Sequence, residues 1–179
     1  DEVREIVKRS DDLNDTIREV LKRVADDSRR LNEEIRRKVT EASRENEELI
    51  KEIEDRARKN PEKKEDLRRL VRELDEKLKE VKRDLERLIE EDKRKIERVL
   101  EELRRLVEED RKRIDEAREA GVDEEIIKRL RDRTKKTLDE VRKIIEDLKD
   151  ESRKTSEELR ELIKRNKEKN DELLERLER

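Results

Sequence analysis

The feature that most constrains this chain is an 18-residue repeat of its apolar positions. The repeat is plainest between residues 88 and 117, where LIEEDKRKIERVLEELRR is followed by LVEEDRKRIDEA. An aspartate recurs on the same stripe, at Asp92 and again at Asp110. Because 18 residues make five turns of a 3.6-residue helix, residues 18 apart lie on one face, one above the other. The repeat therefore predicts long helices with an apolar stripe that polar residues interrupt at regular heights.

The spacing of the stripe also predicts the shape of the helices. From Val3 to Ala57 the stripe advances 54 residues in 15 steps, a mean of 3.6. A left-handed coiled coil needs a mean of 3.5, whereas a straight helix has 3.6 residues per turn. We therefore expect nearly straight helices with little supercoil.

Two short breaks divide the chain into three segments of similar length. Pro61 suits the first position of a helix and disfavours a helical conformation at Asn60, whose side chain is then expected to cap that helix. Gly121 suits the left-handed position after a helix, and Asp123 is expected to cap the next one. Short connections between long helices predict an all-α, antiparallel up-down-up bundle, a single domain of residues 1–179. The three predicted helices cover residues 2–59, 61–120 and 123–178.

Polar residues on the three stripes are predicted to meet at common heights. Folding the chain at its two breaks makes facing residue numbers sum to about 121 for the first pair of helices and about 244 for the second. Ser28 with Asp92 sums to 120, and Asp92 with Ser152 sums to 244. The same rule groups the remaining polar positions into three layers, roughly 27 Å apart at 1.5 Å per residue. The predicted layers are Ser10, Asn14, Asp110, Thr134 and Thr137; then Ser28, Asn32, Asp92, Ser152 and Thr155, with Ser156 nearby; then Asn46, Asn166 and Asn170 against Leu74.

We interpret these layers as hydrogen-bond networks that fix helix register and pairing. A polar group in an apolar core costs free energy unless it is hydrogen-bonded, so a slipped helix would strand several groups at once. Buried polar residues set register in other helical assemblies for this reason.

The residue types present argue against catalysis and ligand binding. The chain has no histidine and no cysteine, which removes the usual base for a serine nucleophile and all thiolate metal sites. Each layer offers at most one inward carboxylate, fewer than a calcium site needs, and no glycine-rich loop could hold a phosphate. We therefore expect no enzymatic activity, no metal or cofactor, and no small-molecule substrate.

Charge and hydropathy bear on partners and location. The 54 basic and 57 acidic residues nearly cancel, and they are interspersed, so no clustered basic patch for nucleic acid is expected. Membrane-surface helices usually carry aromatics and a basic polar face, and the chain has no aromatic residue. No apolar run within the helical segments exceeds two residues, which argues against a signal peptide and a transmembrane segment. We expect a soluble monomer without partners, a synthetic protein made in the cytoplasm.

The whole chain resembles de novo designed, parametrically generated three-helix bundles with modular buried hydrogen-bond networks. The resemblance rests on the 18-residue copies, the polar layers, the loops Asn60-Pro61 and Gly121-Val122-Asp123, and the missing aromatics, histidine and cysteine. It implies a stable structural scaffold with no natural activity, or a single-chain precursor that splits at its loops into three associating helices.

Two other functions stay open at this stage. The first is a helical association module, in which stripe edges support a dimer or filament; these edges include Val7, Val20, Val71, Leu100 and Leu138. The second is a natural lipid-binding protein of the exchangeable apolipoprotein kind, which also uses repeats compatible with a straight helix. Light scattering tests the first alternative, and opening on lipid vesicles tests the second.

Overall fold

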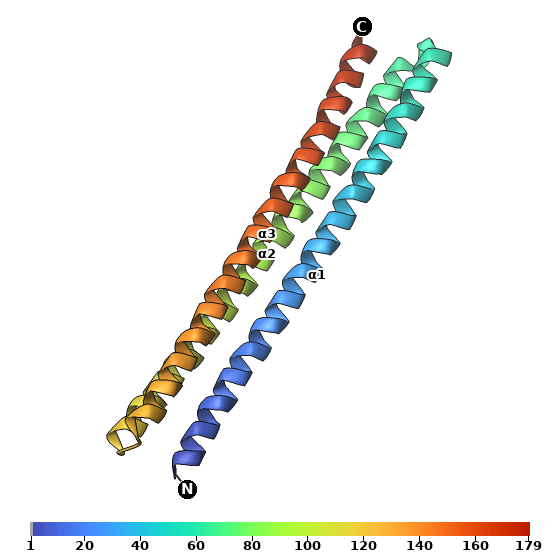
Figure 1. The fold of residues 1–179 in the computed structure, drawn as a ribbon. Coiled ribbons are helices and arrows are strands. Elements are labelled where there is room, and N and C mark those ends of the chain that lie inside the picture. The colour runs from blue at the N-terminus through green and yellow to red at the C-terminus, as the bar shows by residue number, and fades with distance from the viewer. Residues whose placement is uncertain (1) are drawn as a thin grey trace. The chain divides into compact units, whose positions relative to one another are not determined.

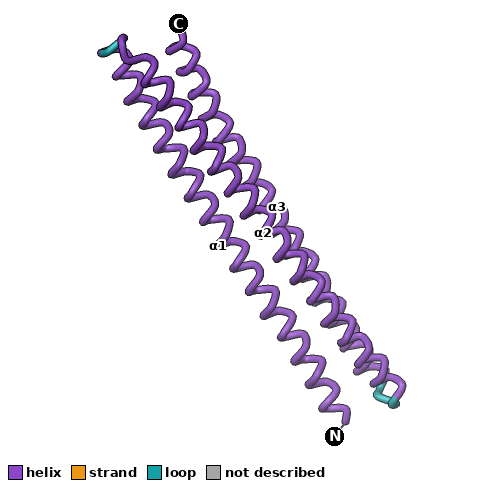
Figure 2. Tube along the Cα trace, turned by 180° about the vertical axis from the view of Figure 1, so that it is seen from behind, coloured by secondary structure: helices purple, strands orange, loops and turns teal. Residues whose placement is uncertain are grey.

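The computed structural model describes residues 2–179, and within this range every regular element is helical (Figure 1). The three long helices are α1 (Glu2–Lys59), α2 (Lys64–Glu119) and α3 (Glu124–Glu178), and a 3-10 turn, η1 (Pro61–Lys63), precedes α2. Short connections join them (Figure 2). The prediction of an all-α chain with three long helices is therefore confirmed.

The first connection differs from the prediction at Asn60. This residue makes no side-chain capping bond, and its backbone, with φ −134° and ψ 76°, lacks the conformation that usually aims a capping side chain. The amide of Asn60 instead donates to the carbonyl of Arg56 at 2.8 Å, which closes the last turn of α1. The predicted cap is therefore wrong, because Asn60 still belongs to the end of α1. The 3-10 turn after Pro61 takes up the reversal, and α2 begins at Lys64 rather than at residue 61.

The second connection has the geometry of a glycine-terminated helix. Gly121 has φ 88°, and its amide donates to the carbonyl of Arg118 at 3.1 Å. The amide of Val122 donates to the carbonyl of Ala117 at 3.1 Å, which completes the paired bonds of a Schellman motif. Asp123 then accepts a bond from the amide of Glu125 on its side chain at 3.4 Å, and α3 begins.

The chain divides into two compact units, each of which contains part of every long helix. Unit 1 comprises residues 2–30 and 92–151 of the described chain, and unit 2 comprises residues 31–91 and 152–179. The prediction of a single domain stays a prediction. The two units are therefore described separately below.

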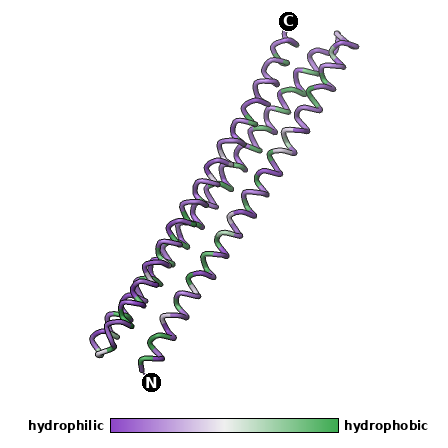
Figure 3. The backbone as a smooth tube through the Cα atoms, viewed as in Figure 1, coloured by the Kyte–Doolittle hydropathy of each residue, from purple (hydrophilic) through white to green (hydrophobic). Residues whose placement is uncertain are grey.

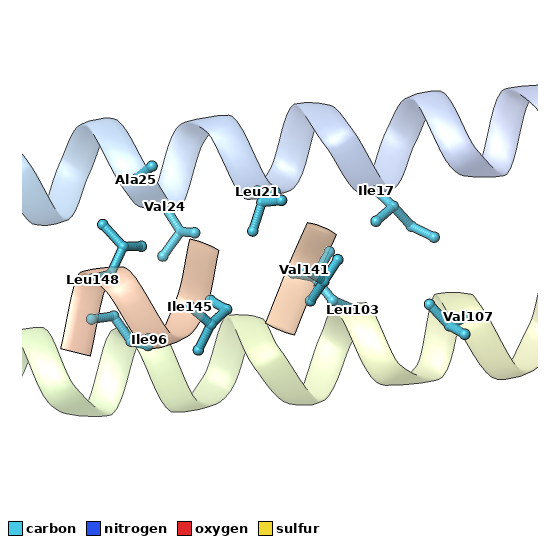
Figure 4. Close-up of a cluster of buried hydrophobic side chains, with 10 residues drawn as sticks. All are labelled: Ile17, Leu21, Val24, Ala25, Ile96, Leu103, Val107, Val141, Ile145 and Leu148. Carbon is cyan, nitrogen blue, oxygen red and sulfur yellow. The ribbon is translucent and has the colours of Figure 1, made fainter. Parts of the chain in front are cut away.

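In unit 1, apolar side chains from all three helices point toward one another (Figure 4). This central cluster contains Ile17, Leu21, Val24, Ala25, Ile96, Leu103, Val107, Val141, Ile145 and Leu148. A second cluster, formed by Ile114, Ala117, Ile127 and Leu130, closes the core beside the second connection, and Val122 packs against it. Burying aliphatic side chains of this size contributes about 1.5–3 kcal/mol each, the main favourable term in the unit.

In unit 2, two further clusters draw on the same three helices. One contains Ile35, Val39, Leu85, Leu88, Leu159 and Ile163. The other contains Ile50, Ile53, Leu67, Val71, Leu74, Leu173 and Leu177. In both units α1 and α3 run parallel, as the pairs Arg18–Glu140, Arg29–Glu151 and Arg36–Glu158 show by rising together in number. Contacts between α2 and α3 run in opposite order, so α2 is antiparallel, which confirms the predicted up-down-up arrangement.

The outer surface is polar along every helix. Hydropathy alternates around each helix, with apolar residues recurring at intervals along the trace (Figure 3). Among the described residues no large hydrophobic side chain is exposed. A search of residues 2–179 finds no helix both long and apolar enough to cross a bilayer.

Candidate functional site

The candidate site is the set of polar side chains inside the apolar core. Eleven of the thirteen residues predicted from the sequence are buried, whereas Asn32 and Ser152 are only half-buried, contrary to their predicted place in the core. A residue at the edge of a stripe can turn toward solvent, and these two positions do so. The structure also buries two serines beyond the predicted thirteen, Ser43 and Ser156.

The first polar cluster lies in unit 1 and is centred on Asp110, which is 0% exposed. Its Oδ2 accepts bonds from Asn14 Nδ2 at 3.3 Å and from Thr134 Oγ1. Thr137 Oγ1 in turn donates to Asn14 Oδ1 at 2.6 Å. Residues of α1, α2 and α3 are thereby linked through a single carboxylate.

Both donors to Asp110 also have an acceptor on their own helix. Asn14 Nδ2 lies 2.8 Å from the Ser10 carbonyl, and Thr134 Oγ1 lies 3.0 Å from the Leu130 carbonyl. A threonine hydroxyl carries one proton, so Thr134 can serve either acceptor. By contrast, Asp110 Oδ1 is buried and has no hydrogen-bond partner among the described side chains. The cluster thus has an acceptor in excess.

An arginine that sequence reasoning missed closes this cluster toward the surface. Arg133 donates through Nη2 to Ser10 Oγ at 2.8 Å and pairs with the carboxylate of Asp11. Partial burial of the guanidinium lowers the pKa of Arg133, because removal from water disfavours its charged form. Its position beside Thr134 on α3 was the available signal, but a charged residue next to a stripe is usually solvated.

The residues predicted for the second layer are divided between the units. In unit 1, Ser28 Oγ donates to Asp92 Oδ2 at 3.2 Å, and both residues are buried. In unit 2, Thr155 is buried and its hydroxyl accepts a bond from Arg36 Nη2 at 3.4 Å. Ser156 is buried there too, and among the described residues no protein partner bonds its hydroxyl.

The third cluster lies in unit 2 and is built from amides rather than a carboxylate. Asn46 Nδ2 donates to Asn170 Oδ1 at 2.9 Å and to Asn166 Oδ1 at 3.1 Å. Asn170 Nδ2 returns a bond to Asn46 Oδ1 at 3.0 Å. An amide both donates and accepts, so this set closes on itself between α1 and α3.

Two further side chains complete the third cluster. Asn166 Nδ2 donates to the hydroxyl of buried Ser43 at 2.6 Å, and Asn170 Nδ2 donates to Asp75 Oδ1 on α2 at 3.0 Å. Leu74, the residue predicted to face the amides, belongs to the neighbouring apolar cluster. The position of Ser43 three residues before Asn46 was the signal that could have identified it, because residues three apart share a helix face.

The geometry of these clusters offers little to a substrate. The hydroxyl of Thr134 contacts a carboxylate, but Thr134 and Asp110 are both fully enclosed in the core. Among residues 2–179 no group of three or more histidine, cysteine, aspartate or glutamate side chains is placed to hold a metal ion. What the arrangement can do chemically is exchange hydrogen bonds between helices.

Comparisons with known proteins bear on the fold. No family model matches the chain, and no curated protein matches it in sequence. A solved structure described as a computationally designed three helix bundle is similar, with a TM-score of 0.54. The alignment covers 98% of this chain and 88% of that chain at 17% sequence identity. At this identity the likeness shows a shared three-helix fold.

Proposed function

We propose that this chain is a designed structural scaffold with no natural biochemical activity, whose buried polar clusters specify helix register and pairing. The observation that carries the proposal is the amide cluster of unit 2. Asn46, Asn166 and Asn170 bond one another across the α1–α3 interface inside an apolar core. Such a network satisfies its members only when the helices stand at one offset.

The physical argument concerns the alternatives that the clusters exclude. Leucine and isoleucine pack almost equally well against many neighbours, so an apolar stripe alone discriminates weakly between registers. A buried amide without a partner costs about 1–3 kcal/mol, and a slip of α3 against α1 would strand several. The clusters therefore raise the free energy of wrong pairings more than they lower that of the correct one.

The designed origin is supported by the sequence and by the comparison. The 18-residue copies, the single glycine and single proline at the two connections, and the absence of aromatics together describe an idealised backbone with a chosen surface. The similar solved structure is itself described as computationally designed.

The register role is tested by removing the amide cluster as a unit. The variant carries Ser43→Ala, Asn46→Leu, Asn166→Leu and Asn170→Leu. We expect it to stay helical, with unfolding free energy equal to or above that of the parent, because paired polar groups are replaced together. We also expect its amide NMR spectrum to broaden or multiply, since several registers become similar in energy. A control with Lys→Arg at exposed positions 51, 82, 135 and 164 keeps a single spectrum.

A single sharp spectrum for the four-residue variant would contradict the register role. The scaffold proposal itself is tested separately, by mass and by lipid binding. Light scattering of the parent is expected to give 22.0 kDa at all concentrations, and circular dichroism is expected to be unchanged by vesicles. Mass that grows with concentration would instead favour the association module, and co-flotation with vesicles would favour the lipid-binding alternative.

A further inference from the structure

The exposed seam between α1 and α3 carries a second pattern, made of ion pairs. Six cross-helix pairs join residues that are 122 positions apart in the sequence, three in each unit. In unit 1 they are Asp11–Arg133, Arg18–Glu140 at 3.5 Å and Arg29–Glu151 at 3.8 Å. In unit 2 they are Arg36–Glu158 at 2.9 Å, Glu47–Lys169 at 2.9 Å and Glu54–Arg176 at 3.2 Å.

The signs of these pairs are not uniform along the seam. On α1 they read negative, positive, positive in unit 1 and positive, negative, negative in unit 2, and α3 carries the opposite sign at each place. The α1 positions follow one another at intervals of 7, 11, 7, 11 and 7 residues, so each recurs 18 positions later. The charges therefore share the repeat of the apolar stripe but break its sign symmetry.

The apolar repeat leaves one specific wrong pairing almost as good as the correct one. Shifting α3 by 18 residues places Ile145 where Ile127 stood, and Ile163 where Ile145 stood. The buried polar residues discriminate only in part, because the shift replaces Thr137 by Thr155 beside Asn14. An 18-residue stagger would therefore keep both the packing and the first polar cluster.

We propose that the ion-pair signs along the α1–α3 seam form a register code that rejects pairing with a second copy of this chain at an 18-residue stagger. Within one chain the short connections hold α1 and α3 at their offset. Between two copies no connection does, so an α3 that pairs in trans can settle at any offset the side chains tolerate. A staggered pair leaves both ends open, and such contacts propagate into oligomers.

The code penalises the stagger in both directions. Shifted one way, four pairs still overlap, and three of them bring like charges together: Asp11 with Glu151, Arg29 with Lys169 and Arg36 with Arg176. Shifted the other way, three of four are again alike: Arg29 with Arg133, Glu47 with Glu151 and Glu54 with Glu158. Like charges at these distances repel, whereas all six native pairs attract.

The test makes the code uniform without touching the core. The uniform variant exchanges the partners of three pairs: Arg18→Glu, Arg29→Glu, Arg36→Glu, Glu140→Arg, Glu151→Arg and Glu158→Arg. Every native pair remains oppositely charged and the composition is unchanged, but α1 is now negative and α3 positive at all six places. Every pair in the staggered arrangement then attracts too.

A matched control makes the same number of changes and keeps the code. It exchanges three other pairs: Arg18→Glu, Arg36→Glu, Glu54→Arg, Glu140→Arg, Glu158→Arg and Arg176→Glu. All native pairs again survive, and three of the four staggered pairs remain alike in sign. Parent, uniform variant and control are unfolded in guanidinium, refolded at high protein concentration and low salt, and analysed by size exclusion with light scattering.

We expect the uniform variant to show an oligomer-to-monomer ratio about tenfold above that of the control, since each of three pairs that stops repelling contributes roughly a factor of two. The excess should shrink at 1 M salt, where charges are screened within about 3 Å. Equal ratios for the uniform variant and the control would overturn the proposal, as would an excess that salt leaves unchanged. Neither result depends on the buried amides, which are identical in all three proteins.

Discussion

The carboxylate cluster of unit 1 and the amide cluster of unit 2 solve the same problem with different chemistry. Asp110 only accepts hydrogen bonds, and both printed donors converge on one of its oxygens while the other has none among the described groups. Asn46 both donates and accepts, and it exchanges bonds with Asn170 in both directions. The amide cluster is closed, whereas the carboxylate cluster is not.

The difference indicates where each cluster is sensitive. Donors to Asp110 have backbone acceptors in reserve, so the loss of the carboxylate strands little. The oxygens of Asn166 and Asn170 are bonded by Asn46, so the loss of that amide strands both. Burial alone therefore does not predict the cost of a substitution; the partners' other options do.

The largest effect is expected for Asn46→Leu. Two carbonyl oxygens, on Asn166 and Asn170, lose their bonds from Asn46 inside the core, at about 1–3 kcal/mol each, so we expect a loss of about 3 kcal/mol. Chemical denaturation measures it. Combining the change with Asn166→Leu and Asn170→Leu should recover most of the loss, because both sides of each bond are then removed. A single substitution that costs nothing would contradict the comparison.

A smaller loss is expected for Thr137→Val. The two side chains are nearly the same shape, and the change removes the donor that Asn14 Oδ1 receives at 2.6 Å. One stranded oxygen predicts a loss of about 1.5 kcal/mol, again by denaturation. The matched control is Thr155→Val, where the lost bond is a 3.4 Å contact from a surface arginine, and we expect less than about 0.5 kcal/mol. Equal costs would show that the cross-helix bond contributes little.

Asp110→Leu is expected to be nearly neutral or to stabilise by up to about 1 kcal/mol, since apolar replacement of buried charged groups is often tolerated. Asn14 and Thr134 can turn to the carbonyls of Ser10 and Leu130. Asp110→Ala should be about 2 kcal/mol less stable than Asp110→Leu, because it leaves a cavity. A loss for Asp110→Leu as large as that for Asn46→Leu would remove the distinction between the two clusters.

The smallest effect concerns the surface pair Glu86–Arg160, in which two bonds of 2.6 and 2.7 Å join α2 to α3. The hydrogen bond from Arg160 lowers the pKa of Glu86 below its ordinary value of 4.5. A lowered pKa stabilises the folded state above the ordinary value, and this contribution is lost as pH falls through the folded value. Glu86→Gln should therefore cost less than about 1 kcal/mol at pH 7, after solvent screening, and nothing near pH 2. Melting curves at both pH values test this; a cost that is independent of pH would contradict it.

The sequence by itself determined the helices, their approximate ends and the chemical types inside the core. These follow from local geometry, because the 3.6-residue period, the proline and the glycine act on the backbone wherever the chain folds. Eleven of the polar positions predicted from this period are buried.

Only the tertiary structure decided which residues at the edges of the stripes are buried and how the bonds close. Successive residues are about 100° apart around a helix, so a modest rotation set by packing against two neighbours exchanges one edge for the other. Packing thus buries Ser43, leaves Asn32 and Ser152 half-buried, and draws Arg133 over the carboxylate cluster. Sequence periodicity has no information about that rotation, because it depends on all three helices together.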